Sequence, residues 1–242
     1  MASGQTRPSK PCHLSTSQTM KGPRKRQLLH SPSGFDWRLL QGVAFVLFLA
    51  CALDFPPLRR WPWLWLAPLV PYLLLVMGIP PIRRSLGWFR LGRLSIGAVV
   101  ATMGIMVLTI SALIAFSTIV RPDVMSRRNL LPICAMGGSV VAGVLFTTTN
   151  AILEELVFRG VLFDAVRSQW DTRSTLVGTA ILFGLGHLHG YPPGLIGACL
   201  ATVFGFGAGV LRFWTGGLLL PIVAHMGADA TIFSILVHSG GA

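Results

Sequence analysis

Three short motifs in the C-terminal half of the chain place ionisable residues inside apolar stretches. They are Glu154-Glu155-x-x-x-Arg159, Phe183-x-x-x-His187 and His225-x-x-x-Asp229. An ionisable group at the centre of a membrane helix costs at least about 2.5–3.5 kcal/mol, so such residues mark a functional site by default. Carboxylates and imidazoles placed together suit the transfer of protons to and from water.

The two adjacent glutamates are the only ones in the chain, and they point in different directions on a helix. Glu155 and Arg159 are four residues apart, so they share one helix face and can form an ion pair. Glu154 points about 100° away from that face. One carboxylate is therefore neutralised locally, and Glu154 is left to serve a cavity.

Chain geometry predicts that Glu154 and His187 meet. The polar stretch 168–173 is predicted to join two antiparallel helices, and both residues lie about 16–17 positions from its centre. At about 1.5 Å of rise per residue they reach a similar depth. His225 and Asp229 follow the next turn, near Thr215, and share one helix face within reach of the same layer. A His–Asp pair that only fixes helix packing is the alternative for these last two residues.

The residue types indicate the hydrolysis of an amide. A carboxylate paired with an imidazole can take a proton from water, and a second histidine with a polar neighbour can hold a developing oxyanion. The same four side chains, Glu154, His187, His225 and Asp229, could instead ligate zinc and leave a position open for water. From the residues alone, water activated by a glutamate and water bound to zinc both stay open, and no cofactor is firmly predicted. No serine or cysteine stands out as a nucleophile.

Composition indicates a membrane protein. Of the 242 residues, 52% are hydrophobic and only 12% are charged, against about 25% charged in soluble domains. The net charge of +12 could suggest nucleic acid. However, the basic residues lie in the N-terminal tail and in short breaks between apolar stretches, which is typical of loops beside anionic lipid. Four scattered cysteines without a CxxC motif are expected to be small hydrophobic residues.

Two regions are predicted along the chain. Residues 1–34 are polar and basic and form a disordered tail, while 35–242 form the membrane domain. Stretches of spanning length predict an all-α, polytopic transmembrane bundle of about seven or eight helices. The predicted segments are Trp37–Pro56, Trp61–Ile82, Leu94–Val120, Leu130–Val166 (a span plus a second helix), Ser174–His189, Pro192–Leu211 and Leu218–Val237.

The positions of charged and aromatic residues predict how the bundle sits in the bilayer. Basic residues in the tail, in the break 83–93 and at Arg212 favour a cytoplasmic N-terminus. Trp61, Trp63 and Trp65 are predicted to anchor the second span at the membrane interface. His189 and His238 lie nearer span ends and are interpreted as interfacial residues.

The three motifs resemble those of the CPBP family of intramembrane proteases, which includes the type II CAAX prenyl endopeptidases and the bacterial Abi proteins. That family's pattern is Glu-Glu-x-x-x-Arg, then Phe-x-x-x-His, then His-x-x-x-Asn/Asp. The chain matches it in the same order within a core of 130–237. The resemblance implies a CAAX-protease-like helical bundle and an intramembrane peptidase activity.

The resemblance also implies roles for the motif residues. Glu154 with His187 would activate water, and His225 with Asp229 would bind the oxyanion. Glu155 and Arg159 would hold the shape of the site, supported by Phe183. The prenyl endopeptidases have Asn where this chain has Asp229, and a carboxylate can donate a hydrogen bond only when protonated.

Substrate and location follow from the same resemblance. We expect a membrane-anchored protein or peptide substrate, cut near its C-terminus or membrane anchor and not necessarily prenylated. The compact form and basic tail favour the bacterial inner membrane. A proton-coupled transporter and a non-catalytic membrane scaffold are the alternatives. A transporter predicts internal repeats or paired broken helices in two halves, whereas the ionisable residues here lie in one half.

Overall fold

The structure is a computed structural model, and it describes Met1 and residues 35–88, 90–123 and 140–238. Most of the predicted tail, residues 2–34, lies outside the described residues, as does the first part of the predicted segment Leu130–Val166. Within the described residues the chain is helical and contains no strand. The predicted all-α class is therefore confirmed.

Four of the described helical segments are long and apolar enough to cross a membrane. They are α4 (Ile96–Val120), the continuous run of α6 (Val140–Glu155), η3 (Leu156–Leu162) and α7 (Phe163–Gln169), then α9 (Gly194–Thr215) and α10 (Leu219–His238). Two shorter helices are apolar, α1 (Trp37–Leu53) and α2 (Trp63–Gly78), and α8 (Thr172–Gly186) is a further helix of 15 residues. The outer face of α4 is apolar, with Val107 and Leu108 exposed by 63% and 72%. These helices are those of an integral membrane protein.

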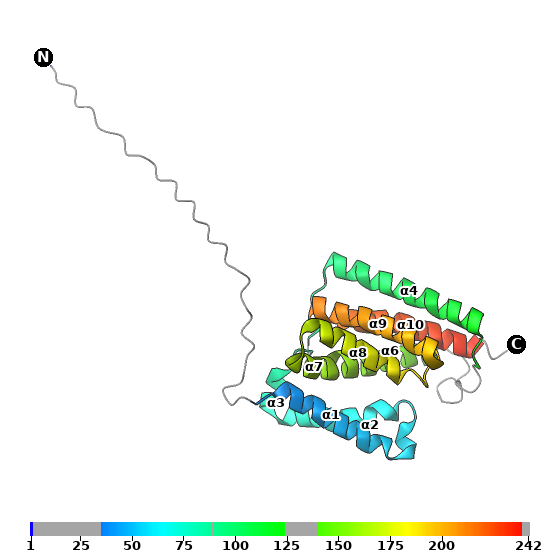
Figure 1. Cartoon of the computed structure of the whole chain (residues 1–242), viewed down its shortest axis with the longest axis horizontal. Coiled ribbons are helices and arrows are strands. Elements are labelled where there is room, and N and C mark those ends of the chain that lie inside the picture. The colour runs from blue at the N-terminus through cyan, green and yellow to red at the C-terminus, as the bar shows by residue number, and fades with distance from the viewer. Residues whose placement is uncertain (2–34, 89, 124–139, 239–242) are drawn as a thin grey trace. The chain divides into compact units, whose positions relative to one another are not determined.

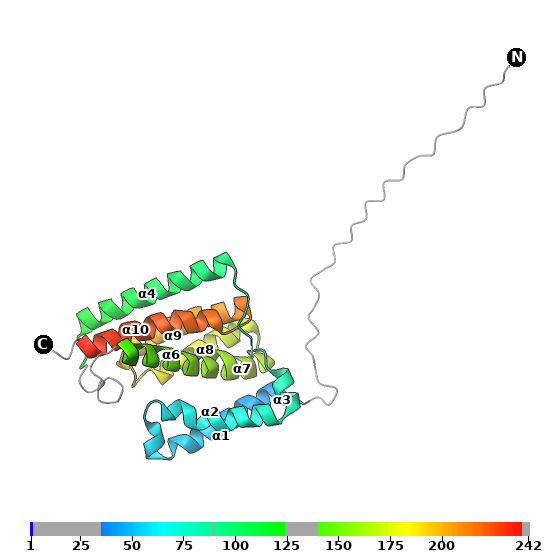
Figure 2. The same ribbon diagram turned by 180° about the vertical axis from the view of Figure 1, so that it is seen from behind.

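The helices from Asp36 onward form successive layers. Figures 1 and 2 show α4 outermost, then α9 and α10, then α6, α7 and α8, with α1, α2 and the short α3 (Pro80–Ser85) on the opposite side. Contacts follow this order: α4 packs on α10 and α9, α10 on α6, α8 on α9, and α1 on α2 and α7. Of the motif helices, α10 thus contacts both α4 and α6, and α8 packs on α9.

Some element boundaries differ from the predicted segments. The predicted segment Trp61–Ile82 is divided, because Pro80 and Pro81 start a new short helix and Ile79 before them is extended. The predicted span and second helix within Leu130–Val166 form one continuous run from Val140, with a π-helical turn in the middle.

The turn between α7 and α8 is built as the sequence predicts. The Asp171 carboxylate accepts hydrogen bonds from the Arg173 and Ser174 amides and so caps α8. Hydrogen bonds from the Ser174 hydroxyl and these amides hold the pKa of Asp171 below its usual value. Because this turn reverses the chain, α8 runs back along α6–α7 and returns His187 towards Glu154.

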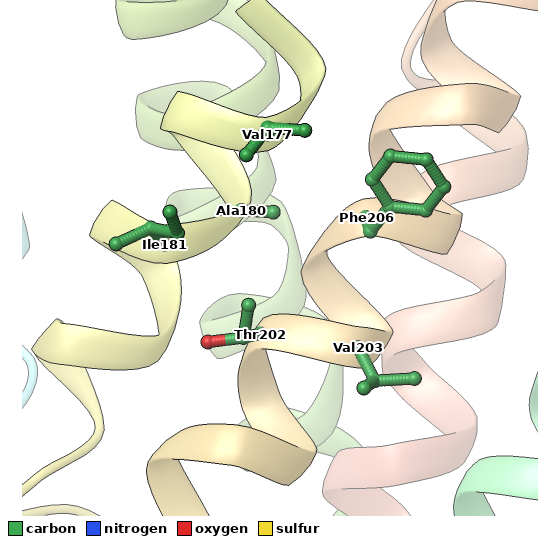
Figure 3. Close-up of a pocket in the computed structure, with 6 residues that line it drawn as sticks. All are labelled: Val177, Ala180, Ile181, Thr202, Val203 and Phe206. Carbon is green, nitrogen blue, oxygen red and sulfur yellow. The ribbon is translucent and has the colours of Figure 1, made fainter. Parts of the chain in front are cut away.

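The contact between α8 and α9 has two notable features, a close approach at a glycine and an apolar groove. Gly184 on α8 faces Thr202 and the Ala198 carbonyl on α9, where a side chain would collide with both. An apolar groove on this interface is lined by Val177, Ala180, Ile181, Thr202, Val203 and Phe206 (Figure 3). Ile181, Val203 and Phe206 are exposed, so this groove belongs to the lipid-facing surface.

Candidate active site

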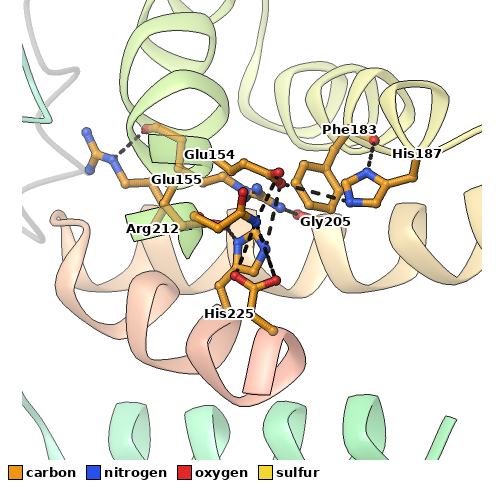
Figure 4. A network of polar contacts seen from close by, with 10 residues as sticks. Glu154, Glu155, Phe183, His187, Gly205, Arg212 and His225 are labelled. Carbon is orange, nitrogen blue, oxygen red and sulfur yellow. Dashed lines mark hydrogen bonds and ion pairs between the residues drawn. The ribbon is translucent and has the colours of Figure 1, made fainter. Parts of the chain in front are cut away.

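The three motifs converge in the interior of the bundle. Glu154 and Glu155 end α6, His187 caps the C-terminal end of α8, and His225 lies in the first half of α10. Figure 4 shows Glu154, His187 and His225 pointing toward one another from these separate helices. Burial decreases toward one side, because the His187 side chain is 19% exposed and that of His225 only 4%.

The Glu154 carboxylate lies between the two imidazoles. Its Oε2 atom is 3.9 Å from Nε2 of His187 and 3.7 Å from Nε2 of His225. This oxygen is buried and accepts no hydrogen bond within the described part of the protein. Polar groups at such separations are spaced so that a water molecule can bridge them. The predicted approach of Glu154 and His187 is therefore observed.

The hydrogen bonds of His225 fix which of its nitrogens faces Glu154. Nδ1 of His225 is 2.7 Å from Oε1 of Glu155, and Nη1 of Arg159 is 2.9 Å from the same oxygen. A carboxylate paired with arginine accepts hydrogen bonds only, so Nδ1 carries a proton and donates it. Nε2 of His225 consequently faces the Glu154 carboxylate.

His187 is oriented in the same way by a different acceptor. Its Nδ1 lies 2.8 Å from the carbonyl oxygen of Phe183, which can only accept. In neutral His187 the proton is thus on Nδ1, and Nε2 is a free acceptor directed at Glu154. Both imidazoles therefore present Nε2 to one carboxylate oxygen, an arrangement that suits proton transfer.

A π-helical turn positions the supporting arginine. Arg159 lies in η3, and its guanidinium is enclosed by Glu155, the Gly205 carbonyl at 3.2 Å and the Phe183 ring, whose centroid is 4.2 Å from Cζ. Phe183 also stacks on His187, with ring centroids 4.4 Å apart. Single π-helical turns within α-helices occur often at functional sites. The predicted Glu155–Arg159 pair is thus present and buried.

The sequence reasoning missed one residue of the site. Asn150, one turn before Glu154 on α6, places its Nδ2 atom 3.2 Å from Oε1 of Glu154 and 3.2 Å and 3.4 Å from the two oxygens of Asp229. Trp61 donates to Oδ1 of Asn150 at 3.0 Å. The available signal was a polar side chain four residues before Glu154 in an apolar helix.

The three tryptophans at the start of the second predicted span differ in exposure, and their place at the membrane interface stays a prediction. Trp61 and Trp65 are half-buried and contact Phe146 and Phe158 respectively, while Trp63 is exposed. Arg212, predicted to mark a cytoplasmic loop, is buried in α9. There it pairs with Asp164 of α7.

The motif residues are of types that can ligate a metal, so their spacing matters. Among the described residues, no three histidine, cysteine, aspartate or glutamate side chains are arranged so that they could hold a metal ion. The Nδ1 atoms of both histidines point to Glu155 and to a carbonyl, which leaves the Nε2 atoms available, as in histidines that bind metals. The spacing of the side chains as placed is not that of a zinc centre, and no chemical step below depends on one.

The fold and site together define a helical membrane protein with a buried glutamate–histidine centre. Residues 136–231 match the family model described as type II CAAX prenyl endopeptidase Rce1-like. This stretch contains every residue of the three motifs, and the resemblance noted from them is confirmed. No curated protein and no solved structure matches the chain.

Proposed function

We propose that this protein is an intramembrane endopeptidase that hydrolyses a peptide bond near the C-terminus or membrane anchor of a membrane-associated protein or peptide. The observation that carries this proposal is the buried Oε2 atom of Glu154, which accepts no hydrogen bond in the described residues and faces Nε2 of both His187 and His225. The family match at 136–231 supports a protease of the CAAX type.

The proposed reaction begins with a water molecule between Glu154 and His187. Glu154 takes a proton from this water, and the resulting hydroxide oxygen attacks the carbonyl carbon of the scissile peptide. The carbonyl oxygen becomes an oxyanion beside His225. Donation from Nε2 requires His225 as an imidazolium, a charge that the carboxylates of Glu155 and Asp229 would stabilise. Glu154 then returns the proton to the leaving amine, and the peptide bond breaks.

Asp229 has a different role in this proposal from that of an oxyanion donor. Its Oδ1 atom lies 3.7 Å from Nε2 of His225, and both its oxygens face the Asn150 amide. A carboxylate in this place orients and balances the charge of His225, since it cannot itself donate to an oxyanion. The oxyanion is therefore held mainly by His225.

We further propose that the substrate is a peptide or a C-terminal membrane anchor, with prenylated tails as the alternative substrate class.

The basic residues around 83–93 support a cytoplasmic N-terminus, as in a bacterial inner membrane protein. Arg212 does not count toward a cytoplasmic N-terminus, because it is buried. The arginines of the break 83–93 are exposed and still support this orientation; they are Arg83, Arg84, Arg90 and Arg93.

The proposal is tested by proteolysis with purified, detergent-solubilised protein. Wild type and Glu154→Gln are compared on membrane-anchored reporters and on reporters with a CAAX tail, each with and without a zinc chelator. Asp54→Asn, which alters an exposed acid at the end of α1, is the matched control. We expect cleavage by wild type and Asp54→Asn that survives the chelator, and a loss of at least about 1,000-fold in Glu154→Gln.

Each other result has a definite meaning. Loss of cleavage with the chelator would replace the glutamate-activated water by a metal-bound one. Cleavage that persists in Glu154→Gln would exclude Glu154 as the base. A biological output that survives in Glu154→Gln without any cleavage would favour the scaffold, whereas proton-coupled transport that is lost in Glu154→Gln, again without cleavage in wild type, would favour the carrier.

A further inference from the structure

A buried amide lies at the centre of the site between two carboxylates. The Asn150 side chain is 8% exposed, and its Nδ2 atom is within 3.4 Å of Oε1 of Glu154 and of both oxygens of Asp229. An amide nitrogen carries two hydrogens, so it can donate to both carboxylates at once. Without such a donor, two buried carboxylates would face each other with unsatisfied oxygens, which is costly.

Trp61, which lies just before α2, fixes the orientation of the Asn150 amide. Nε1–H of Trp61 donates to Oδ1 of Asn150 at 3.0 Å. Indole N–H is a donor only, so the oxygen of the amide must face Trp61 and the nitrogen must face the carboxylates. Packing of the Trp61 ring on Phe146, with centroids 5.5 Å apart, holds the indole in this place.

We infer that Asn150 is a positioning residue of the active site, with its amide held in the working orientation by Trp61. The inference rests on the proposed function of Glu154. By donating to Oε1, Asn150 sets the rotation of the Glu154 carboxylate, so that Oε2 faces His187 and His225. By donating to Asp229 as well, it holds the second carboxylate beside His225 and provides a shared donor between the two acids. Its role therefore acts on the catalytic step rather than on substrate binding.

The chain offers a nearly isosteric substitution that separates the amide's donor role from its other roles. Asn150→Asp keeps the size of the side chain and an oxygen that accepts from Trp61. It replaces the NH2 group, which donates to Glu154 and Asp229, by a carboxylate oxygen that accepts. We expect kcat to fall by about 10- to 100-fold with KM changed by less than about threefold, as for a misplaced catalytic group. Thr148→Val, a half-buried polar residue on the same helix, should stay within about twofold of wild type.

A milder substitution tests the part played by Trp61. Trp61→Phe removes the indole donor and leaves an aromatic ring, so the amide can rotate. We expect kcat to fall by about three- to tenfold in the wild-type background and to be unchanged when the same substitution is made in Asn150→Asp. A double-mutant cycle of this kind shows whether Trp61 acts through Asn150, since independent effects would multiply.

The measurements distinguish this inference from the proposed function. All variants are assayed beside Glu154→Gln, and their thermal unfolding in detergent is recorded. An inactive Glu154→Gln with Asn150→Asp at wild-type kcat would overturn the inference alone. Multiplicative effects of Trp61→Phe and Asn150→Asp would also overturn it, since the indole would then act independently. Full activity of Glu154→Gln would remove the proposed function on which the inference rests.

Discussion

Arg212 donates a hydrogen bond of 3.0 Å from Nε to the backbone carbonyl of Arg159, and so ties α9 to the π-helical turn of the site. Its Nη2 atom is 3.3 Å from Asp164 on α7, and Asp164 also accepts from the amide of Gly87. One buried arginine thus joins α9, η3, α7 and the segment after α3. Because it reaches no motif side chain, its role is to hold the backbone that carries Arg159.

The first prediction concerns this buried pair. Arg212→Ala leaves Asp164 as a buried carboxylate without its cation and should lower the free energy of unfolding by about 3–5 kcal/mol. Asp164→Asn leaves the buried Arg212 guanidinium without its counter-charge, and its one amide oxygen can replace only one of the two carboxylate oxygens that accept from Arg212 and Gly87, so it should cost a similar amount. Arg83→Ala, which removes an exposed arginine, is the control and should change little. Thermal unfolding in detergent provides the measurement, and equal costs for Arg212→Ala and Arg83→Ala would contradict the prediction.

The local and periodic features of the site could be predicted from sequence. The Glu155–Arg159 pair follows from a spacing of four on one helix, and a π-helical turn there does not break it. The approach of Glu154 and His187 follows from counting residues on both sides of one turn. Both inferences use only helical geometry and short chain connections.

The missed features depend on tertiary packing. Asn150 contacts Asp229, 79 positions away, and Trp61, 89 positions away, so its spacing of four from Glu154 could indicate only the contact with that glutamate. In the sequence, Arg212 and Asp164 resemble ordinary charges at span ends. Their pairing depends on the tertiary contact between α9 and α7, which no local pattern shows. Residue type predicts an interfacial position for Trp61 and Trp65 but does not show that α6–η3 provides Phe146 and Phe158 as their ring partners.

The second prediction separates charge balance from catalysis at Glu155. Glu155→Gln leaves Arg159 buried without a counter-charge and removes the anionic acceptor of His225. We expect a loss of about 3–5 kcal/mol of stability and at least about 100-fold in kcat.

The double variant Glu155→Gln/Arg159→Met is the matched test. Removal of both charges should recover much of the stability, because no unpaired charge is left buried. Activity should stay low, since His225 still lacks its carboxylate. Recovery of activity together with stability would show that Glu155 serves the fold alone.

The third prediction concerns the aromatic ring shared by the supporting arginine and the first histidine. Phe183 is almost fully buried, stacks on His187 and lies over the Arg159 guanidinium. Phe183→Ala should cost about 3–5 kcal/mol of stability, while Phe183→Leu should retain the fold and lower kcat by about tenfold through loss of ring stacking. Phe206→Ala, at a ring that is 44% exposed in the outer groove, should leave both stability and kcat near wild type. An active, stable Phe183→Ala would exclude this role for the ring.

The last prediction tests how closely α8 must approach α9. A Cβ atom at Gly184 would collide with the Thr202 hydroxyl and with the Ala198 carbonyl, and a backbone oxygen cannot rotate away. Gly184→Ala should therefore push α8 outward, lower stability by about 1–3 kcal/mol and move His187, three residues further on, away from Glu154. Gly186→Ala is the control on the same helix, because its new Cβ would meet only Phe158 at an ordinary 3.8 Å. We expect the proteolytic rate to fall in Gly184→Ala by more than its unfolding explains, at a temperature where both variants are folded. Equal rates for the two variants would show that the position of His187 does not depend on this contact.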